Sequence, residues 1–161
     1  MAIKTIKRRR RENKTDYNLR IGLLKSKNGR IVVRRTNKYV YLQLVETKEA
    51  QDFVKKQISS KELLKNGWNE KSSGSLKSIP AAYLTGILFA KEVGKGEYNI
   101  DTGMVRNVHG SRIYAAIKGM IDGGMKINAY AKSFPSKERL MGEHLDEEAK
   151  KIINKVKEKI Q

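Results

Sequence analysis

The stretch RIVVRRTNKYVYLQLV, residues 30–45, decides the fold of this chain. It holds two runs of β-branched and aromatic residues, which favour strands, on either side of Thr36 and Asn37. A short polar break between two such runs is typical of an antiparallel hairpin, because Asn tolerates turn conformations. We therefore predict strands over residues 30–35 and 38–45, with a weaker third strand over 51–58.

Helical patterns dominate the chain beyond the hairpin. Ser59 and Glu62 have the spacing of a capping box, which predicts a short helix that ends at Asn66-Gly67. Apolar residues at helical spacing then predict three longer helices, with a short strand between the first two. These elements cover residues 80–93, 97–101, 111–121 and 146–160. Antiparallel strands followed by crossover helices indicate an α/β fold.

Positive charge is concentrated at the start of the chain. The formal net charge is +18, and residues 1–40, with 14 Lys and Arg against Glu12 and Asp16, account for +12 of it. Self-repulsion disfavours the compact state, so such a concentration indicates a polyanionic partner, most commonly nucleic acid. An anionic lipid surface is the weaker alternative, because no bulky apolar face accompanies the charge.

Residues 1–29 are predicted to form a basic arm. The five consecutive cations at 7–11 repel one another, so this part is expected to be disordered on its own. A short helix is expected to follow, with Thr15 as its cap and a turn at Asn28-Gly29 as its end.

Few residues suit catalysis or metal binding. The chain has no cysteine, which excludes disulfides and thiolate zinc sites, and its two histidines, His109 and His144, have no triad context. Glu46, Asp52 and Asp101 are candidate nuclease carboxylates, but each falls near the end of a predicted strand rather than in a converging set. We therefore expect no enzyme activity, cofactor, metal or small-molecule substrate. No apolar run is long enough to span a membrane, and no secretory signal is expected.

Local strings make the interpretation more specific. They occur in order from Lys7 to Ile127 and include KTDY (14–17), LLKS (23–26), RIVVR (30–34), TNKY (36–39), KNGW (65–68), AAYLTG (81–86), DTG (101–103), GSR (110–112) and DGG (122–124). Through these strings the chain resembles the archaeal and eukaryotic form of the large-subunit ribosomal protein that binds 5S rRNA, which is universal large-subunit family eighteen.

The resemblance implies a mixed sheet with crossover helices and a ribonuclease H-like topology, preceded by a basic N-terminal arm and followed by a C-terminal helix. The expected parts are an RNA-binding arm at 1–29, an α/β domain at 30–127, and a loop with an amphipathic helix at 128–161. The implied role is structural, in the cytoplasmic ribosome. The protein would bind 5S rRNA and link it to the large-subunit rRNA in the central protuberance, beside neighbouring large-subunit ribosomal proteins. The alternatives are a ribonuclease H-like RNA-processing enzyme and a general basic nucleic-acid-binding protein.

The expected RNA contacts lie in the arm, in the hairpin and at one later helix N-terminus. Cations neutralise phosphates, Tyr side chains stack on unpaired bases, and backbone N–H groups at a helix N-terminus favour phosphate. Through the resemblance, His109, Gly110 and Arg112 are assigned to that N-terminus. The other expected contacts are Lys7, Arg8, Arg9, Arg10, Arg11, Lys14, Thr15, Tyr17, Arg20, Lys25, Ser26, Arg30, Arg34, Arg35, Asn37, Lys38 and Tyr39.

Overall fold

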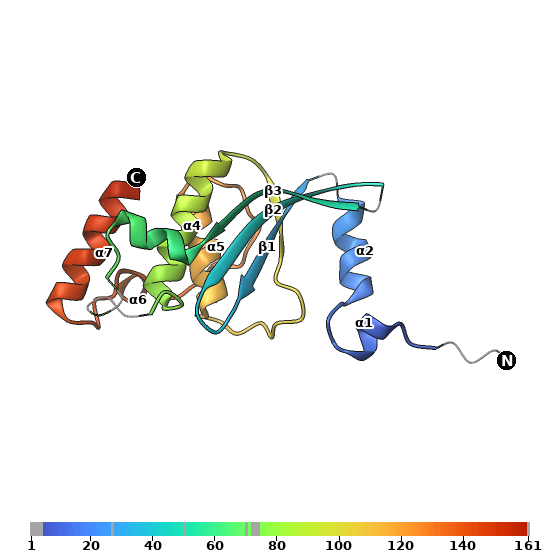
Figure 1. Ribbon diagram of the computed structural model, residues 1–161, viewed down its shortest axis with the longest axis horizontal. Helices are drawn as coiled ribbons and strands as arrows, with labels where there is room; N and C mark the ends of the chain where they lie inside the picture. Colours follow the sequence, from blue (N-terminus) through green and yellow to red (C-terminus); the bar gives the residue numbers. More distant parts are fainter. Residues whose placement is uncertain (1–4, 27, 50, 70, 72–74, 161) are drawn as a thin grey trace.

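The computed structural model describes residues 5–26, 28–49, 51–69, 71 and 75–160 of the 161-residue chain. Helices gather at one end, a sheet lies in the middle, and the basic arm lies at the other end (Figure 1). The predicted α/β class is therefore confirmed.

The sheet has four strands in the order β3-β2-β1-β4. Strands β1 (Gly29–Arg35), β2 (Val40–Lys48) and β3 (Gln51–Ser59) are antiparallel neighbours, whereas β4 (Tyr98–Asp101) pairs parallel with β1. The sheet is thus mixed, and the predicted hairpin and third strand are confirmed. Apolar alternation is weak in β3 because this strand is an edge of the sheet and is exposed over residues 51–57.

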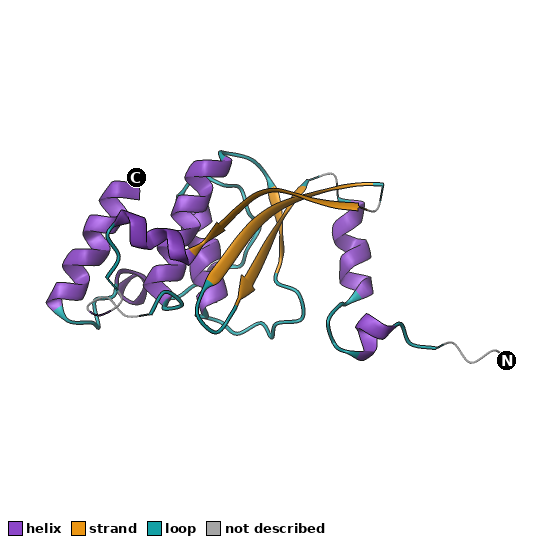
Figure 2. Cartoon of the chain, in the orientation of Figure 1, coloured by secondary structure: helices purple, strands orange, loops and turns teal. Residues whose placement is uncertain are grey.

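Helices α4 (Ile79–Val93) and α5 (Arg112–Asp122) cover one face of the sheet (Figure 2). Their apolar side chains join Ile31 and Leu42 of the strands in one buried core. The capping-box segment forms a 3₁₀ helix, η1 (Ser60–Asn66), in which the Ser59 N–H donates to Glu62 Oε1 at 3.2 Å. The predicted helices over these segments are therefore confirmed, with η1 more tightly wound than an α-helix.

The C-terminal segment packs on the helical end of the molecule. Helix α7 (Glu147–Ile160) is amphipathic as predicted, and its buried stripe contacts α4 and η1. Two short elements before it, η2 (Ala131–Ser133) and α6 (Lys137–Met141), carry no repeated apolar pattern and were not predicted. The ribonuclease H-like topology stays a prediction.

The expectation that the cationic run at the start of the arm lacks structure is wrong. Residues Arg8–Arg11 form one helical turn, α1. Glu12 offsets part of their repulsion, because its carboxylate lies 3.7 Å from Arg8 Nε and 2.9 Å from Lys14 Nζ. One acidic residue directly after the run therefore permits a turn that five cations alone disfavour.

The boundaries of the next helix, α2 (Tyr17–Lys25), also differ from the prediction. Its cap is Asp16 rather than Thr15, because Asp16 Oδ1 accepts hydrogen bonds from the second and third N–H groups of the helix. Thr15 instead accepts a hydrogen bond from Arg9 Nε at 2.9 Å, which joins the two helices of the arm. Gly29 opens strand β1 instead of ending the helix in a turn.

Helices α4 and α5 approach so closely that their crossing requires glycine. A Cβ added to Gly86 of α4 would overlap the carbonyl oxygen of Ala116, and one added to Gly119 of α5 would overlap that of Tyr83. Both obstacles are backbone atoms, which cannot rotate out of the way as a flexible side chain can. Any larger residue at either position therefore has to push the helices apart.

Replacing Gly86 by Ala should lower the free energy of unfolding by about 1–3 kcal/mol, because an inserted methyl group in a tight contact forces a backbone shift. Gly22→Ala in α2 is the matched control, since no atom lies within 4 Å of its added Cβ. That variant should be neutral or stabilising by up to about 1 kcal/mol, because Ala is the better helix former. Chemical denaturation measures both, and an unchanged midpoint for Gly86→Ala would contradict the close crossing.

Candidate nucleic-acid interface

Asp52 on β3 holds the basic arm against the sheet. Its Oδ2 lies 2.9 Å from Arg20 NH2 of helix α2 and 3.0 Å from Arg30 NH2 of strand β1. Its Oδ1 accepts a hydrogen bond from Thr47 Oγ1 at 2.8 Å. The arm, strand β1 and strand β2 therefore all contact one carboxylate on β3.

Asp101, at the end of β4, makes a second set of arginine contacts. The guanidinium of Arg34 donates to the Asp101 carbonyl oxygen at 2.7 Å and to Oδ1 at 3.1 Å. Arg30 Nε lies 3.7 Å from Asp101 Oδ2, and the Gly103 N–H donates to Oδ1 at 2.8 Å. Arg30 is only 6% exposed, so its charge is used inside the protein rather than on the surface.

The candidate nuclease carboxylates are occupied by cations of the protein itself. Arginines bind Asp52 and Asp101, and Glu46 lies 3.3 Å from Lys55 Nζ. Within the part of the chain that the structure describes, no group of three His, Cys, Asp or Glu side chains could hold a metal ion. These carboxylates therefore hold parts of the protein together through ion pairs.

The pKa of Asp52 lies below its usual value of 3.8. Burial alone raises this pKa, but the hydrogen bonds from Thr47 and Arg20 and the charges of Arg30 and Arg20 together outweigh burial. The carboxylate is thus ionised at neutral pH, and its attachment of the arm to the sheet is at full strength there.

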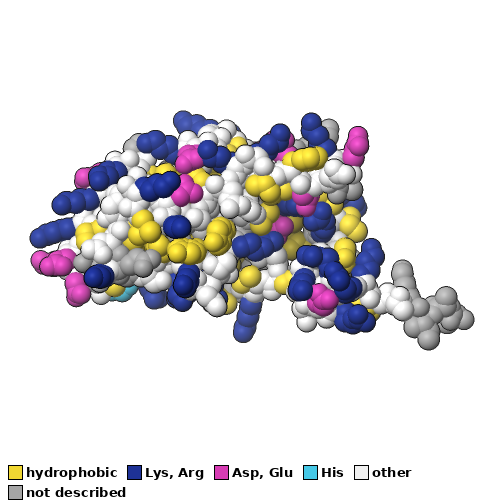
Figure 3. Space-filling model, viewed as in Figure 1, with side chains coloured by type: hydrophobic (Ala, Val, Ile, Leu, Met, Phe, Trp, Pro, Cys, Tyr) yellow, Lys and Arg dark blue, Asp and Glu magenta, His cyan; other side chains and the backbone are white. Residues whose placement is uncertain are grey.

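The arm and the sheet together form a cationic surface. Arg9, Lys14, Thr15 and Arg20 of the arm line a cleft of about 120 Å³ with Arg34 of the sheet. Asp16 and Asp101 also line it, so its cations outnumber its carboxylates. On the face seen in Figure 3, Lys and Arg side chains gather over the arm and also extend over the helical end. The structure thus brings arm residues next to the strand that the sequence analysis also assigned to RNA.

The remaining candidates of the arm differ in how they are held. Lys7 Nζ lies 4.6 Å from the centre of the Tyr17 ring, so these two side chains contact each other. Arg8 and Arg10 are exposed but lie near Glu12 and Asp16. Arg11 and Lys25 are exposed, and Ser26 lines a groove of about 600 Å³ between α2 and the sheet.

The turn of the first hairpin projects its polar residues outward. Thr36 closes the turn, since its N–H donates to the Tyr39 carbonyl at 2.8 Å and its Oγ1 accepts from the Tyr39 N–H at 3.0 Å. Arg35, Asn37 and Lys38 are exposed. The Tyr39 ring meets the edge of Tyr41 at 6.4 Å between ring centres, and Tyr39 is only partly accessible.

The second candidate region lies at the start of α5. Gly110 has a left-handed φ of 67°, and its N–H donates to the Ser133 carbonyl at 2.9 Å, so this N–H is not free for a phosphate. His109 stacks on Tyr114 with 6.3 Å between ring centres. Arg112 begins the helix and lines a small pocket together with residues of the hairpin turn.

Sequence reasoning missed three participants in this surface. Asp52 was considered only as a nuclease carboxylate, and Asp101 as such a carboxylate or as part of a strand-ending turn, because their arginine partners lie far away in the sequence. Lys77, which shares the pocket with Arg112, lies in a polar segment without periodicity, so no sequence signal marked it.

Comparison with known proteins identifies the family. A family model described as "Ribosomal large subunit proteins 60S L5, and 50S L18" matches residues 2–97. The chain belongs to this family. The resemblance inferred from the local strings is therefore confirmed, and this L5/L18-family chain has the structural ribosomal role of a large-subunit protein.

Individual relatives agree with the L5/L18 assignment over most of the chain. The large ribosomal subunit protein uL18 of Korarchaeum cryptofilum is 44% identical over 148 residues, covering 90% of this chain and 74% of the relative. The protein of the same name from Methanoregula boonei is 40% identical over 157 residues, covering 94% and 88%. That of Methanococcoides burtonii is 40% identical over 161 residues, covering 95% and 91%.

None of the helices in the described part of this L5/L18-family chain is both long enough and apolar enough to cross a bilayer.

Helix α2 should detach from the sheet in acid. The pKa of Asp52 is lower in the folded than in the unfolded protein, so its stabilisation is present above 3.8 and disappears as the pH falls through the folded value. Below that range, hydrogen-exchange protection should fall in residues 17–25 before it falls in 79–93. Asp52→Asn should show weak protection of α2 already at neutral pH. Protection that follows the same pH curve in both proteins would contradict this role of Asp52.

Proposed function

We propose that this chain binds 5S rRNA and links it to the large-subunit rRNA in the central protuberance of the cytoplasmic ribosome, in contact with neighbouring large-subunit proteins. One observation carries the proposal. In a chain of a ribosomal family, a cationic arm is fixed to the sheet by the ion pair of Arg20 with Asp52, beside a hairpin whose turn exposes further cations. A rigid support for such an arm reduces the ordering cost that a free cationic tail pays on binding.

The contacts divide the predicted residues into two groups. Arg30 is buried, and Arg34 donates to two oxygens of Asp101, so we assign both mainly to holding the surface in shape. Arg9, Arg11 and Lys14 of the arm and Arg35 and Lys38 of the hairpin turn are exposed, so we assign them to phosphates. Membership of the L5/L18 family supports a structural rather than an enzymatic role.

Affinity for 5S rRNA should depend steeply on salt. If the arm makes roughly 6–10 phosphate contacts, affinity should fall about 10³–10⁵-fold between 50 and 200 mM salt. Deleting residues 1–13 should flatten the slope of log affinity against log salt concentration, because those phosphate contacts and the counterions that they release are lost. Random duplex DNA at the same salt is the control for a general basic protein. An unchanged slope after the deletion, or equal affinity for DNA, would contradict the proposal.

Arg34→Ala and Arg35→Ala should have different consequences, because the two side chains point to opposite faces of β1. Arg35→Ala should weaken RNA binding about tenfold with little change in the free energy of unfolding, since one charge-assisted hydrogen bond is lost. Arg34→Ala should instead lower the free energy of unfolding, because Asp101 loses its main partner. Filter binding and chemical denaturation separate the two effects, and identical profiles for both variants would refute the assignment.

A further inference from the structure

A pocket of about 130 Å³ lies where the β1–β2 turn meets the beginning of helix α5. Arg35, Thr36 and Asn37 line it from the hairpin, Arg112 lines it as the first residue of α5, and Lys77 reaches it from the segment before α4. The turn and the beginning of α5 lie close together in Figure 1. Three separate parts of the chain therefore each bring one cation to the same small cavity.

The charges of this pocket are not compensated by the part of the chain that the structure describes. None of its described lining residues is acidic, and Arg35, Lys77 and Arg112 have no side-chain hydrogen bond or ion pair within that part. The neighbouring arginines of β1 differ sharply, since Arg30 and Arg34 are both paired with aspartates. Three unpaired cations around one cavity repel one another, and an anion inside it would convert that repulsion into attraction.

The N-terminus of helix α5 adds to the positive electrostatic potential of the pocket. The helix has 11 residues, and its cap residue Ser111 makes no side-chain hydrogen bond to the first turn. The positive end of the helix dipole is therefore available to a negative group from outside the helix.

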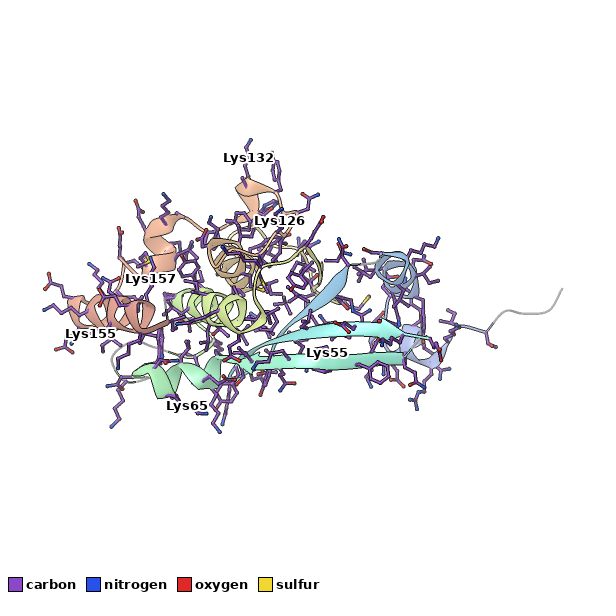
Figure 4. The ribbon with its side chains drawn as sticks, turned by 90° about the horizontal axis from the view of Figure 1, so that it is seen from above. Lys55, Lys65, Lys126, Lys132, Lys155 and Lys157 are labelled. Atoms are coloured by element: carbon purple, nitrogen blue, oxygen red, sulfur yellow. The ribbon has the colours of Figure 1, made fainter. Side chains whose placement is uncertain are left out.

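The labelled lysines of the helical end do not converge in this way. Figure 4 shows Lys65, Lys155 and Lys157 at the far end from the arm, and Lys126 and Lys132 on another side. Lys65, Lys126, Lys132 and Lys155 are exposed, and Lys157 Nζ donates to Met141 Sδ at 3.9 Å. The pocket at the hairpin turn is therefore distinguished by convergence and not only by charge.

We infer that this pocket binds a single phosphate group of the RNA backbone, an inference that rests on the proposed function. A phosphate offers several oxygens to the planar forks of Arg35 and Arg112 and a point charge to the Lys77 ammonium. The hairpin turn and helix α5 then hold the RNA as one unit, independently of the arm. Lys77 is a contact residue in this arrangement, although no sequence motif contains it.

The test uses the full chain with Lys77→Gln, Arg112→Gln and the double substitution. Lys155→Gln on α7 is the matched control, because Lys155 is an exposed lysine on a helix that contributes no lining residue to the pocket. Each pocket substitution should weaken 5S rRNA binding about tenfold, the size of one charge-assisted hydrogen bond. If both side chains hold the same phosphate, the double substitution should lower the log–log salt slope by about one, not two. Its loss of affinity should also be smaller than the product of the single losses.

The outcomes separate the pocket from the proposed function. A wild-type chain that does not prefer 5S rRNA overturns the proposed function itself. If the wild-type chain prefers 5S rRNA but the pocket variants bind it as Lys155→Gln does, only the pocket assignment is overturned. A salt slope that falls by about two in the double variant also overturns the pocket assignment. A titration with inorganic phosphate, followed by the NMR chemical shifts of the Arg112 and Lys77 side chains, tests whether the pocket binds free phosphate and not the RNA backbone. Saturating shifts without any effect of the variants on RNA affinity would identify a free-anion site and overturn the RNA assignment. Denaturation midpoints show whether each variant is folded.

Discussion

The guanidinium of Arg30 lies between two carboxylates, 3.0 Å from Asp52 and 3.7 Å from Asp101, in a site where the residue is only 6% exposed. Its Nε makes no hydrogen bond within the described residues, so the ion pairs are its main compensation. Removing one partner of a buried charge typically costs about 3–5 kcal/mol. Strands β1, β3 and β4 must therefore keep their register for this charge to be tolerated, and the arm is anchored to the same carboxylate through Arg20.

This arrangement divides the cations of the N-terminal quarter between two tasks. Some are neutralised by aspartates and fix geometry, as Arg20, Arg30 and Arg34 do. Others, such as Arg35 at the hairpin turn, are exposed and have no ion pair with any residue that the structure describes. The few acidic residues in this part of the molecule thus determine which positive charges stay available to a polyanion, so charge counting alone overstates the size of the binding surface.

Most of the fold could be predicted from local patterns. The hairpin at 30–45, the capping box at Ser59 and the amphipathic stripe of α7 each depend on neighbouring residues, and each is confirmed. The competition between Thr15 and Asp16 for the cap of α2 was not resolved locally, because both residues suit that position and Arg9 occupies one of them. The burial of Arg30 and the convergence of Lys77 with Arg112 depend on contacts between distant segments, which a single sequence does not encode in any local pattern.

Strand β3 forms one open edge of the sheet and is exposed along most of its length, including Phe53 and Val54. Unpaired backbone groups on such an edge invite a strand of a second molecule, which is the usual start of aggregation. Lys55 and Lys56 lie in the middle of this edge, and the register shifts between Leu44 and Val45 on the adjacent strand. Charge and irregular pairing both oppose edge-to-edge association. The same lysines that contribute to the basic character of the chain thus help to keep the sheet edges of separate molecules apart.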